Sequence, residues 1–293
     1  MTPDMVLRWR KHGKVNPFVS YSGAYTMSEI TDSAGTPYIL YTLTGSGELV
    51  LAGDVQYWMC GGGAGGQKGS TTTNSSTKDS YYYAGTGGGG GYIFSGVLDK
   101  GEYTIAIGIG GGSNTNGGAT TLTKNAVQIS TADGGKYTGA GGSGGGGKGA
   151  TFEDAVYIDL DSGGYWNYDR SSRTFSGGTG KGASTAPFDI ASLKYHCAGG
   201  GGGSTYSNAS TGGGTGGTNG ASGASSAAKG SYVKHIAPGG DYGGGTGACG
   251  SLTAAGNASF YGSGGGGGGV AYGDYVAGGA GYQGVAYVLV PAA

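Results

Sequence analysis

The sequence predicts a mainly β fold with very little α-helix. The expected architecture is a small antiparallel β-sandwich, jelly-roll-like, formed by the N-terminal strands and the C-terminal strand, with a large inserted bundle of polyglycine-II helices. Short runs of β-branched and aromatic residues stand at both ends of the chain, and 75 of the 293 residues are glycine, against a usual share of about 7%. No segment keeps apolar residues at helical spacing for more than a turn or two.

Strand signals dominate the first 60 residues and return at the end of the chain. The clearest early runs are 38–43 (YILYTL), 48–51 (ELVL) and 55–59 (VQYWM), with glycine-containing breaks between them. The last run, 285–290 (VAYVLV), has no local partner, so we expect it to pair with the early strands. This predicts a strand scaffold of residues 21–60 plus 285–293, preceded by an N-terminal docking arm, residues 1–20.

Residues 61–284 are the glycine-rich region that we expect to form the bundle, with Tyr-rich loops. Shorter strand signals interrupt it at 92–94, 103–109 and 126–129. Only two segments, 4–11 and 188–195, are candidates for α-helix.

The residues that interrupt the glycine runs are spaced three apart. The pairs are Ala64 and Gln67, Ala140 and Ser143, and Thr215 and Thr218. In a left-handed helix with three residues per turn, each pair shares one edge and leaves two edges of bare glycine. Such a helix has no internal hydrogen bonds, so its backbone groups must pair with neighbouring helices. The alternative is a set of flexible linkers, which would not be expected to alternate so regularly with strand signals.

Charge and hydropathy argue against several classes of protein. With 16 basic and 17 acidic residues, the net charge of −1 lacks the basic footprint of a nucleic-acid binder. No run approaches the roughly 20 apolar residues of a membrane span, and residues 1–14 lack the apolar core of a secretory signal. Three dispersed cysteines suit a reducing compartment and are interpreted as small buried residues. We therefore expect synthesis in a cytoplasm, with neither nucleic-acid binding nor membrane insertion.

Catalytic and metal-binding motifs are not recognisable. Lys148 and Lys181 follow glycine but lack the Ser or Thr that completes a phosphate-binding loop. The three histidines lack zinc-site spacing, and Asp159 and Asp161 are better explained as an exposed acidic strand end than as a calcium site. We expect no enzymatic activity, no cofactor and no metal.

Three stretches resemble a known family. They are 55–66 (VQYWMCGGGAGG), 87–112 (GGGGGYIFSGVLDKGEYTIAIGIGGG) and 281–292 (GYQGVAYVLVPA). Their order is similar to that in the glycine-rich domain of bacteriophage tail and fibre proteins. In style the chain is also similar to T-even-like phage tip adhesins and to the glycine-rich region of anaplastic lymphoma kinase, without the signal sequence and paired cysteines of the kinase. The resemblance implies a polyglycine-II bundle and a location in the virion.

Tyrosine is the second compositional anomaly, with 23 Tyr against 6 Phe. Many tyrosines stand among Gly, Ser, Thr and Asn, the composition of antibody binding loops. The receptor-binding candidates are Tyr81, Tyr82, Tyr83, Tyr165, Trp166, Tyr168 and Tyr206. The alternative is that these rings lie over glycine surfaces and cap the bundle. The cluster at 164–168 is the strongest candidate.

Two functions remain open at this stage. The first is a tail-fibre or tail-tip adhesin that binds a host cell-surface glycan or protein. The second is a purely structural virion component, in which the bundle is a rigid spacer; a glycine-rich antifreeze bundle fits less well because of the bulky loops. In both cases the basic N-terminal region is expected to contact other virion proteins, and the alternative is a solvated terminus. The sequence leaves a monomer and a homotrimer open.

Overall fold

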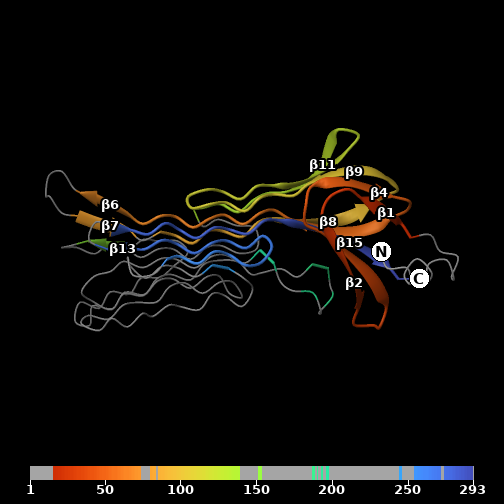
Figure 1. Cartoon of the computed structure of the whole chain (residues 1–293), viewed down its shortest axis with the longest axis horizontal. Coiled ribbons are helices and arrows are strands. Elements are labelled where there is room, and N and C mark those ends of the chain that lie inside the picture. Colours follow the sequence, from red (N-terminus) through yellow and green to blue (C-terminus); the bar gives the residue numbers. More distant parts are fainter. Residues whose placement is uncertain are drawn as a thin grey trace.

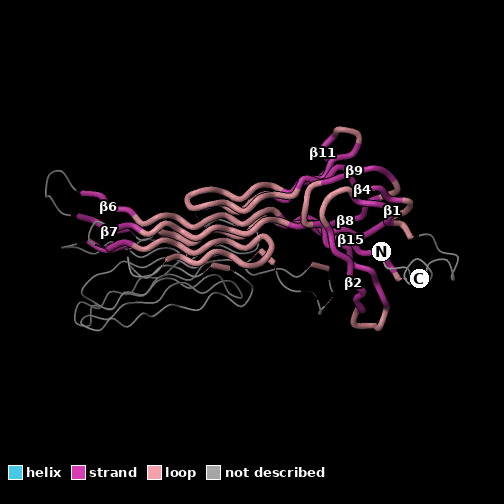
Figure 2. The backbone as a smooth tube through the Cα atoms, in the orientation of Figure 1, coloured by secondary structure: helices cyan, strands magenta, loops and turns pink. Residues whose placement is uncertain are grey.

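The computed structural model describes residues 16–73, 80–83, 85–138, 151–153, 187–188, 190, 193, 196–197, 244–245, 254–271 and 274–292. This part of the chain is all-β, with two antiparallel five-stranded sheets and no helix (Figures 1 and 2). The sheets lie at one end of an elongated molecule, and glycine-rich segments run from them toward a smaller group of strands at the other end.

The first large sheet has the strand order β1-β4-β9-β10-β11. Its strands are β1 (Phe18–Tyr21), β4 (Gly47–Leu51), β9 (Gly101–Ala106), β10 (Thr120–Lys124) and β11 (Val127–Ala132). The second has the order β2-β3-β15-β5-β8. Its strands are β2 (Tyr25–Thr31), β3 (Pro37–Leu43), β15 (Val285–Pro291), β5 (Val55–Cys60) and β8 (Ile93–Leu98). β15 pairs with both β3 and β5, which confirms the expected pairing of the C-terminal strand with early strands.

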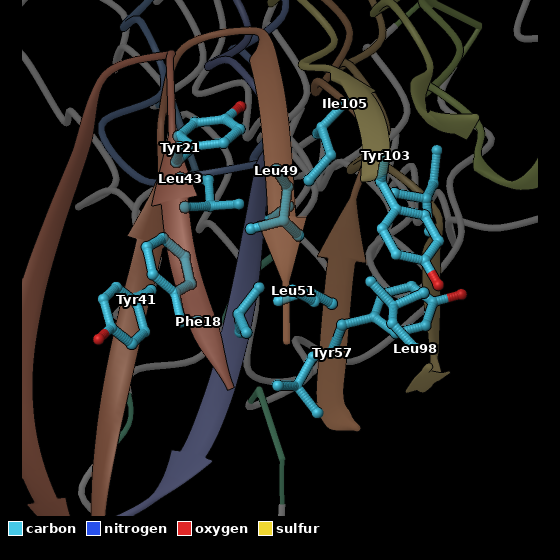
Figure 3. Close-up of a cluster of buried hydrophobic side chains, with 14 of the residues drawn as sticks. Phe18, Tyr21, Tyr41, Leu43, Leu49, Leu51, Tyr57, Leu98, Tyr103 and Ile105 are labelled. Atoms are coloured by element: carbon cyan, nitrogen blue, oxygen red, sulfur yellow. The ribbon is translucent and has the colours of Figure 1, made fainter. Parts of the chain in front are cut away.

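A hydrophobic core joins the facing sides of the two sheets. Figure 3 shows side chains from both sheets, among them Leu43, Leu49 and Tyr57, directed into the same space. Alternate residues of β3 and β15 belong to this core because successive side chains in a strand point to opposite faces. In β15 the other alternate residues, including Tyr287 and Leu289, are also buried, on the outer face of the second sheet. Burial on both faces accounts for the unbroken apolar run in this strand.

The sandwich uses more of the chain than the sequence indicated. β8, β9, β10 and β11 come from within residues 61–284 yet belong to the two sheets, and β1 begins inside the expected arm of residues 1–20. The reason is that glycine segments leave the sandwich and return to it, so the runs between successive excursions become strands. The helix candidate at 188–195 is also corrected. Phe188 has a left-handed φ of 54°, which does not fit an α-helix.

The glycine segments that extend from the two large sheets are bonded to one another rather than loose. They comprise residues 61–69, 85–92, 107–119, 133–138, 262–269 and 276–284. Figure 2 shows them side by side as loops between the two groups of strands. Their backbone N–H groups donate to carbonyl oxygens of neighbouring segments. These bonds replace the side-chain core in this part of the molecule.

The bonds of the 61–69 segment repeat every three residues. Its amides point in turn to three different neighbours, 85–92, 115–118 and 276–282. The donors and acceptors are Gly61 to Tyr92, Ala64 to Gly89 and Gln67 to Thr86; Gly62 to Gly118 and Gly65 to Thr115; and Gly63 to Tyr282, Gly66 to Gly279 and Gly69 to Val276. Ala64 and Gln67, paired by their spacing in the sequence, thus donate to the same neighbour. The pairs at 140 and 143 and at 215 and 218 lie outside the described residues.

The carbonyl oxygens of the same segment accept bonds from three further passes of the chain. Gly135 donates to Gly62, Gly111 to Gly63, and Gly265 to Ala64. Within the described residues, the 61–69 segment is therefore hydrogen-bonded to six passes of the chain. Its residues 61–66 are buried, although only one of them has a side chain.

Close backbone approach explains why these positions are glycine. A Cβ placed on Gly62 would lie 2.0 Å from the carbonyl oxygen of Ile109, and one on Gly63 would lie 1.9 Å from that of Ser263. Backbone atoms cannot swing away as a side chain can, so the neighbouring segment would have to move. Gly112 differs, because a Cβ there would meet no atom within 4 Å.

Where the glycine segments leave the sandwich, a buried hydroxyl joins three parts of the chain. The Thr120 Oγ1 donates to the carbonyl oxygen of Cys60 at 2.7 Å and accepts the N–H of Gly108 at 3.0 Å. Thr120 is fully buried at the start of β10. Its hydroxyl thus ties β10 to the end of β5 and to the 107–119 segment.

We expect Gly62→Ala to lower the free energy of unfolding by about 3 kcal/mol or more, because the new methyl group forces two backbones apart and breaks their hydrogen bonds. The matched variant Gly112→Ala should change it by less than about 0.5 kcal/mol. Chemical denaturation of both variants measures the difference. Equal stabilities would show that close backbone contact is not what requires glycine at position 62.

The second stability prediction concerns Thr120. Thr120→Val keeps the shape of the side chain but leaves the Gly108 N–H and the Cys60 carbonyl without their partner, so we expect a loss of about 2 to 4 kcal/mol. Thr120→Ser retains the hydroxyl and should lose clearly less. Thermal unfolding of the pair tests this, and indistinguishable melting temperatures would argue against a role for the hydroxyl.

Candidate binding surface at the distal tip

The small strands at the end of the molecule remote from the sandwich form its distal tip (Figure 1). They are β6 (Ser70–Thr73), β7 (Ser80–Tyr83), β12 (Thr151–Glu153), β13 (Val270–Ala271) and β14 (Asp274–Tyr275). β6 directly follows the 61–69 segment, and the 85–92 segment leads from the tip back to β8. The tip is thus built on the ends of the hydrogen-bonded glycine segments.

Three consecutive tyrosines occupy the central strand of the three-stranded tip sheet. The strand order is β12-β7-β6, and Tyr81, Tyr82 and Tyr83 are in β7. Tyr82 is in register with Thr71 of β6 and with Phe152 of β12. The backbone of these candidate residues is therefore fixed from both sides, unlike that of a free loop.

Polar side chains hold the glycine segments together just before the tip. The amide of Lys68 donates to the Asn114 Oδ1 at 2.9 Å, and the amide of Gly278 donates to the Ser113 Oγ at 2.9 Å. The Ser113 Oγ in turn donates to the carbonyl oxygen of Gly66 at 3.4 Å. These bonds tie three segments that have no side-chain core between them. The tip therefore has a braced base.

An exposed cation and an exposed aromatic ring lie together at the tip. The Lys68 Nζ is 5.5 Å from the centre of the Tyr275 ring, within the range of a cation–π contact. Tyr275 is 42% exposed, and Lys68 is exposed as well. The sequence analysis missed this pair. The signal was the Tyr-Gly-Asp-Tyr sequence at 272–275 between two glycine runs, and in the structure β13 pairs antiparallel with β14 beside it.

The other candidate residues cannot be placed. Tyr165, Trp166, Tyr168 and Tyr206 lie outside the described residues, as do the N-terminal arm up to residue 15 and the lysines and aspartates tested for motifs. Of the residues singled out as recognition candidates, the structure therefore places only the three in β7. Cys60 and Cys197 are fully buried, as expected, while Cys249 lies outside the described part.

The most polar side-chain cluster of the described residues lies on the sandwich, not at the tip. The Lys124 Nζ is 2.8 Å from the Asp99 Oδ1, and the Tyr103 hydroxyl also donates to that carboxylate. Hydrogen bonds from Lys124 and Tyr103 lower the pKa of Asp99 to about 2. A carboxylate held ionised in this way is a poor general base. The cluster instead braces the β8–β9 turn against β10.

Within the described part of the chain, no group of three or more His, Cys, Asp or Glu side chains is arranged to hold a metal ion. Nor is there, in the same residues, a helix long and apolar enough to cross a membrane. No family model matches the chain, and no curated protein matches it significantly.

Proposed function

We propose that this chain is a structural protein of a bacteriophage virion, a tail-fibre or tail-tip adhesin that presents its distal tip to a receptor on the host surface. The observation that carries the proposal is the position of the Tyr81–Tyr83 strand. It lies at the end of hydrogen-bonded glycine segments, remote from the sandwich. The receptor would be a cell-surface glycan or protein. The proposed role is binding, without catalysis or a cofactor.

We further propose that the glycine segments are polyglycine-II helices. The support is the three-residue repeat of the hydrogen bonds, which matches three residues per turn. Bonding of one segment to six passes of chain also fits a bundle in which each helix is surrounded by others. In the same proposal the two large sheets form a jelly-roll-like sandwich.

A bundle of this kind suits an adhesin because it is stiff and its surface tolerates insertions. The hydrogen bonds run between segments, so a tip strand can be displayed without a large hydrophobic core beneath it. Tyrosines provide broad contact area at low entropic cost. The sandwich end and residues 1–20 would then face the rest of the virion, where the basic arm contacts other virion proteins.

A purely structural virion component is the second candidate. One observation favours it: β7 is a central strand, paired on both sides, which is also a position where tyrosines could serve packing alone. In that case the glycine segments are a spacer and the tip has no receptor. Binding measurements separate the two functions.

We expect the triple variant Tyr81→Ser, Tyr82→Ser and Tyr83→Ser to compete poorly with virions for adsorption to host cells. Each true aromatic anchor contributes about 1 to 3 kcal/mol, so the loss should exceed tenfold in affinity. Adsorption in the presence of increasing purified protein gives the measurement. Mass spectrometry of purified virions first tests whether the chain is a virion component.

The matched control is Tyr92→Ser, which removes an exposed tyrosine near the sandwich. It should compete like the unaltered protein. Thermal unfolding of each variant shows whether the fold is retained. A folded triple variant that competes fully would remove this strand from the receptor site and favour the structural role.

A further inference from the structure

Described residues from a short segment without glycine pack against the outer face of the second large sheet. We call them the strap: residues 187, 188, 190, 193, 196 and 197. Ile190 and Cys197 are buried against β3, β5 and β15, in a cluster with Leu40, Trp58 and Leu289. The strap therefore closes an apolar face that the sandwich core does not use.

His196 is the ionisable group at the centre of this contact. Its side chain is 2% exposed, and its Nε2 lies 2.7 Å from the Tyr287 hydroxyl. The other ring nitrogen, Nδ1, is buried and has no hydrogen-bond partner. A buried polar atom without a partner costs free energy, which makes the docked state of the strap less stable than its apolar contacts alone would make it.

The described residues around the ring supply no counter-charge for an imidazolium. The ring stacks on Phe260 at 4.6 Å and on Tyr287 at 5.4 Å, and it meets Trp58 and Tyr261 at 5.6 and 5.8 Å. The described groups that face it are Trp58 and Cys60 of β5, Tyr287 of β15, Phe260 and Tyr261 of the 260–261 turn, and Cys197 of the strap itself. No carboxylate is among these described groups, and burial raises the pKa of both Tyr261 and Tyr287, so both hydroxyls stay neutral.

Backbone strain is stored at both ends of the strap. Phe188 has a φ of 54° and Cys197 a φ of 61°. Residues other than Gly, Asn and Asp rarely adopt this left-handed backbone conformation. Such residues persist only where surrounding contacts hold them. Release of the strap would relieve this strain, so the docked state depends on the buried apolar contacts.

We propose that the strap is an acid-sensitive latch: protonation of His196 releases the strap residues from the outer face of the sheet while the sandwich stays folded. An imidazolium needs a hydrogen-bond acceptor or water at Nδ1, and the described residues around the docked ring supply no acceptor. Release exposes Trp58, Leu40 and Leu289, an apolar surface that is closed at neutral pH.

The direction of the pH dependence follows from the two states of the latch. Burial lowers the pKa of His196 from 6.5 to about 3 in the docked state. The released strap therefore binds the proton more tightly, so docking is fully stable above about pH 6.5 and weakens as the pH falls toward 3. Between pH 6.5 and 4.5 the equilibrium for release should rise about 50-fold.

Amide hydrogen exchange read by mass spectrometry tests the latch in the full chain. The amide of Cys197 donates to the carbonyl oxygen of Tyr261 at 3.1 Å when the strap is docked. After correction for intrinsic exchange, protection of the peptide that contains Cys197 should fall about 75-fold from pH 7 to pH 4.5. Peptides from β3 and β5 should keep their protection.

Two variants link the effect to His196. His196→Phe retains a ring that can stack, and His196→Gln retains a group that can bond to the Tyr287 hydroxyl. Neither side chain ionises. In whichever variant keeps the strap protected at pH 7, protection should therefore be independent of pH between 7 and 4.5.

Three results would overturn the latch. They are a strap equally protected at both pH values in the unaltered chain, loss of protection in β3 and β5 together with the strap, and the same pH response in a docked variant. If neither variant docks at pH 7, a chain that keeps His196 but carries Trp9→Phe and Trp166→Phe decides instead. In this chain, acrylamide quenching of Trp58 fluorescence must rise from pH 7 to pH 4.5, and constant quenching refutes release.

Discussion

Hydrogen bonding between glycine segments is the interaction on which the rest of this molecule depends. The 61–69 segment directs successive amides to three neighbours and receives bonds from three more. This geometry requires backbones closer together than any side chain permits, as the Cβ positions at Gly62 and Gly63 show. An ordinary domain excludes water with side chains. Here the backbone itself does so, which accounts for a composition with so much glycine.

The sandwich positions the glycine segments, and the glycine segments position the tip. The sandwich fixes the starting points of the segments, and the buried Thr120 hydroxyl joins three of these points. The segments in turn position the tip. Just before it, the Asn114 Oδ1 and the Ser113 Oγ accept hydrogen bonds from the backbone amides of Lys68 and Gly278. A tip mounted in this way is positioned by backbone geometry over its whole length. Its own short strands need to contribute little to that placement.

Local sequence patterns predicted the elements that depend on local chemistry. The strand run at 285–290 was placed correctly because it is apolar throughout, and its pairing with early strands followed from its lack of a local partner. Ala64 and Gln67 were paired by a spacing of three, which reflects the repeat of the backbone bonds.

The membership of β8–β11 in the sheets was missed, because the pairing of each strand depends on where the preceding glycine segment returns to the sandwich. The apolar spacing at 188–193 suggested a helix, but it arises from contact with a sheet face and includes a left-handed residue. The Lys68–Tyr275 pair joins residues about 200 positions apart, and no local pattern reports such a contact.

The place of β15 in its sheet has a consequence for biosynthesis. β15 lies between β3 and β5, so each of these strands lacks one of its two neighbours until residues 285–291 have been synthesised. Every glycine excursion is synthesised before the sheet that anchors it can close. Closure of the second sheet must therefore follow synthesis of every glycine segment, and it involves contacts of long sequence separation, which form slowly. During that interval the apolar edges of β3 and β5 are open to pairing with other chains. A ribosome that stops shortly before residue 285 would release a chain whose second sheet is split in two.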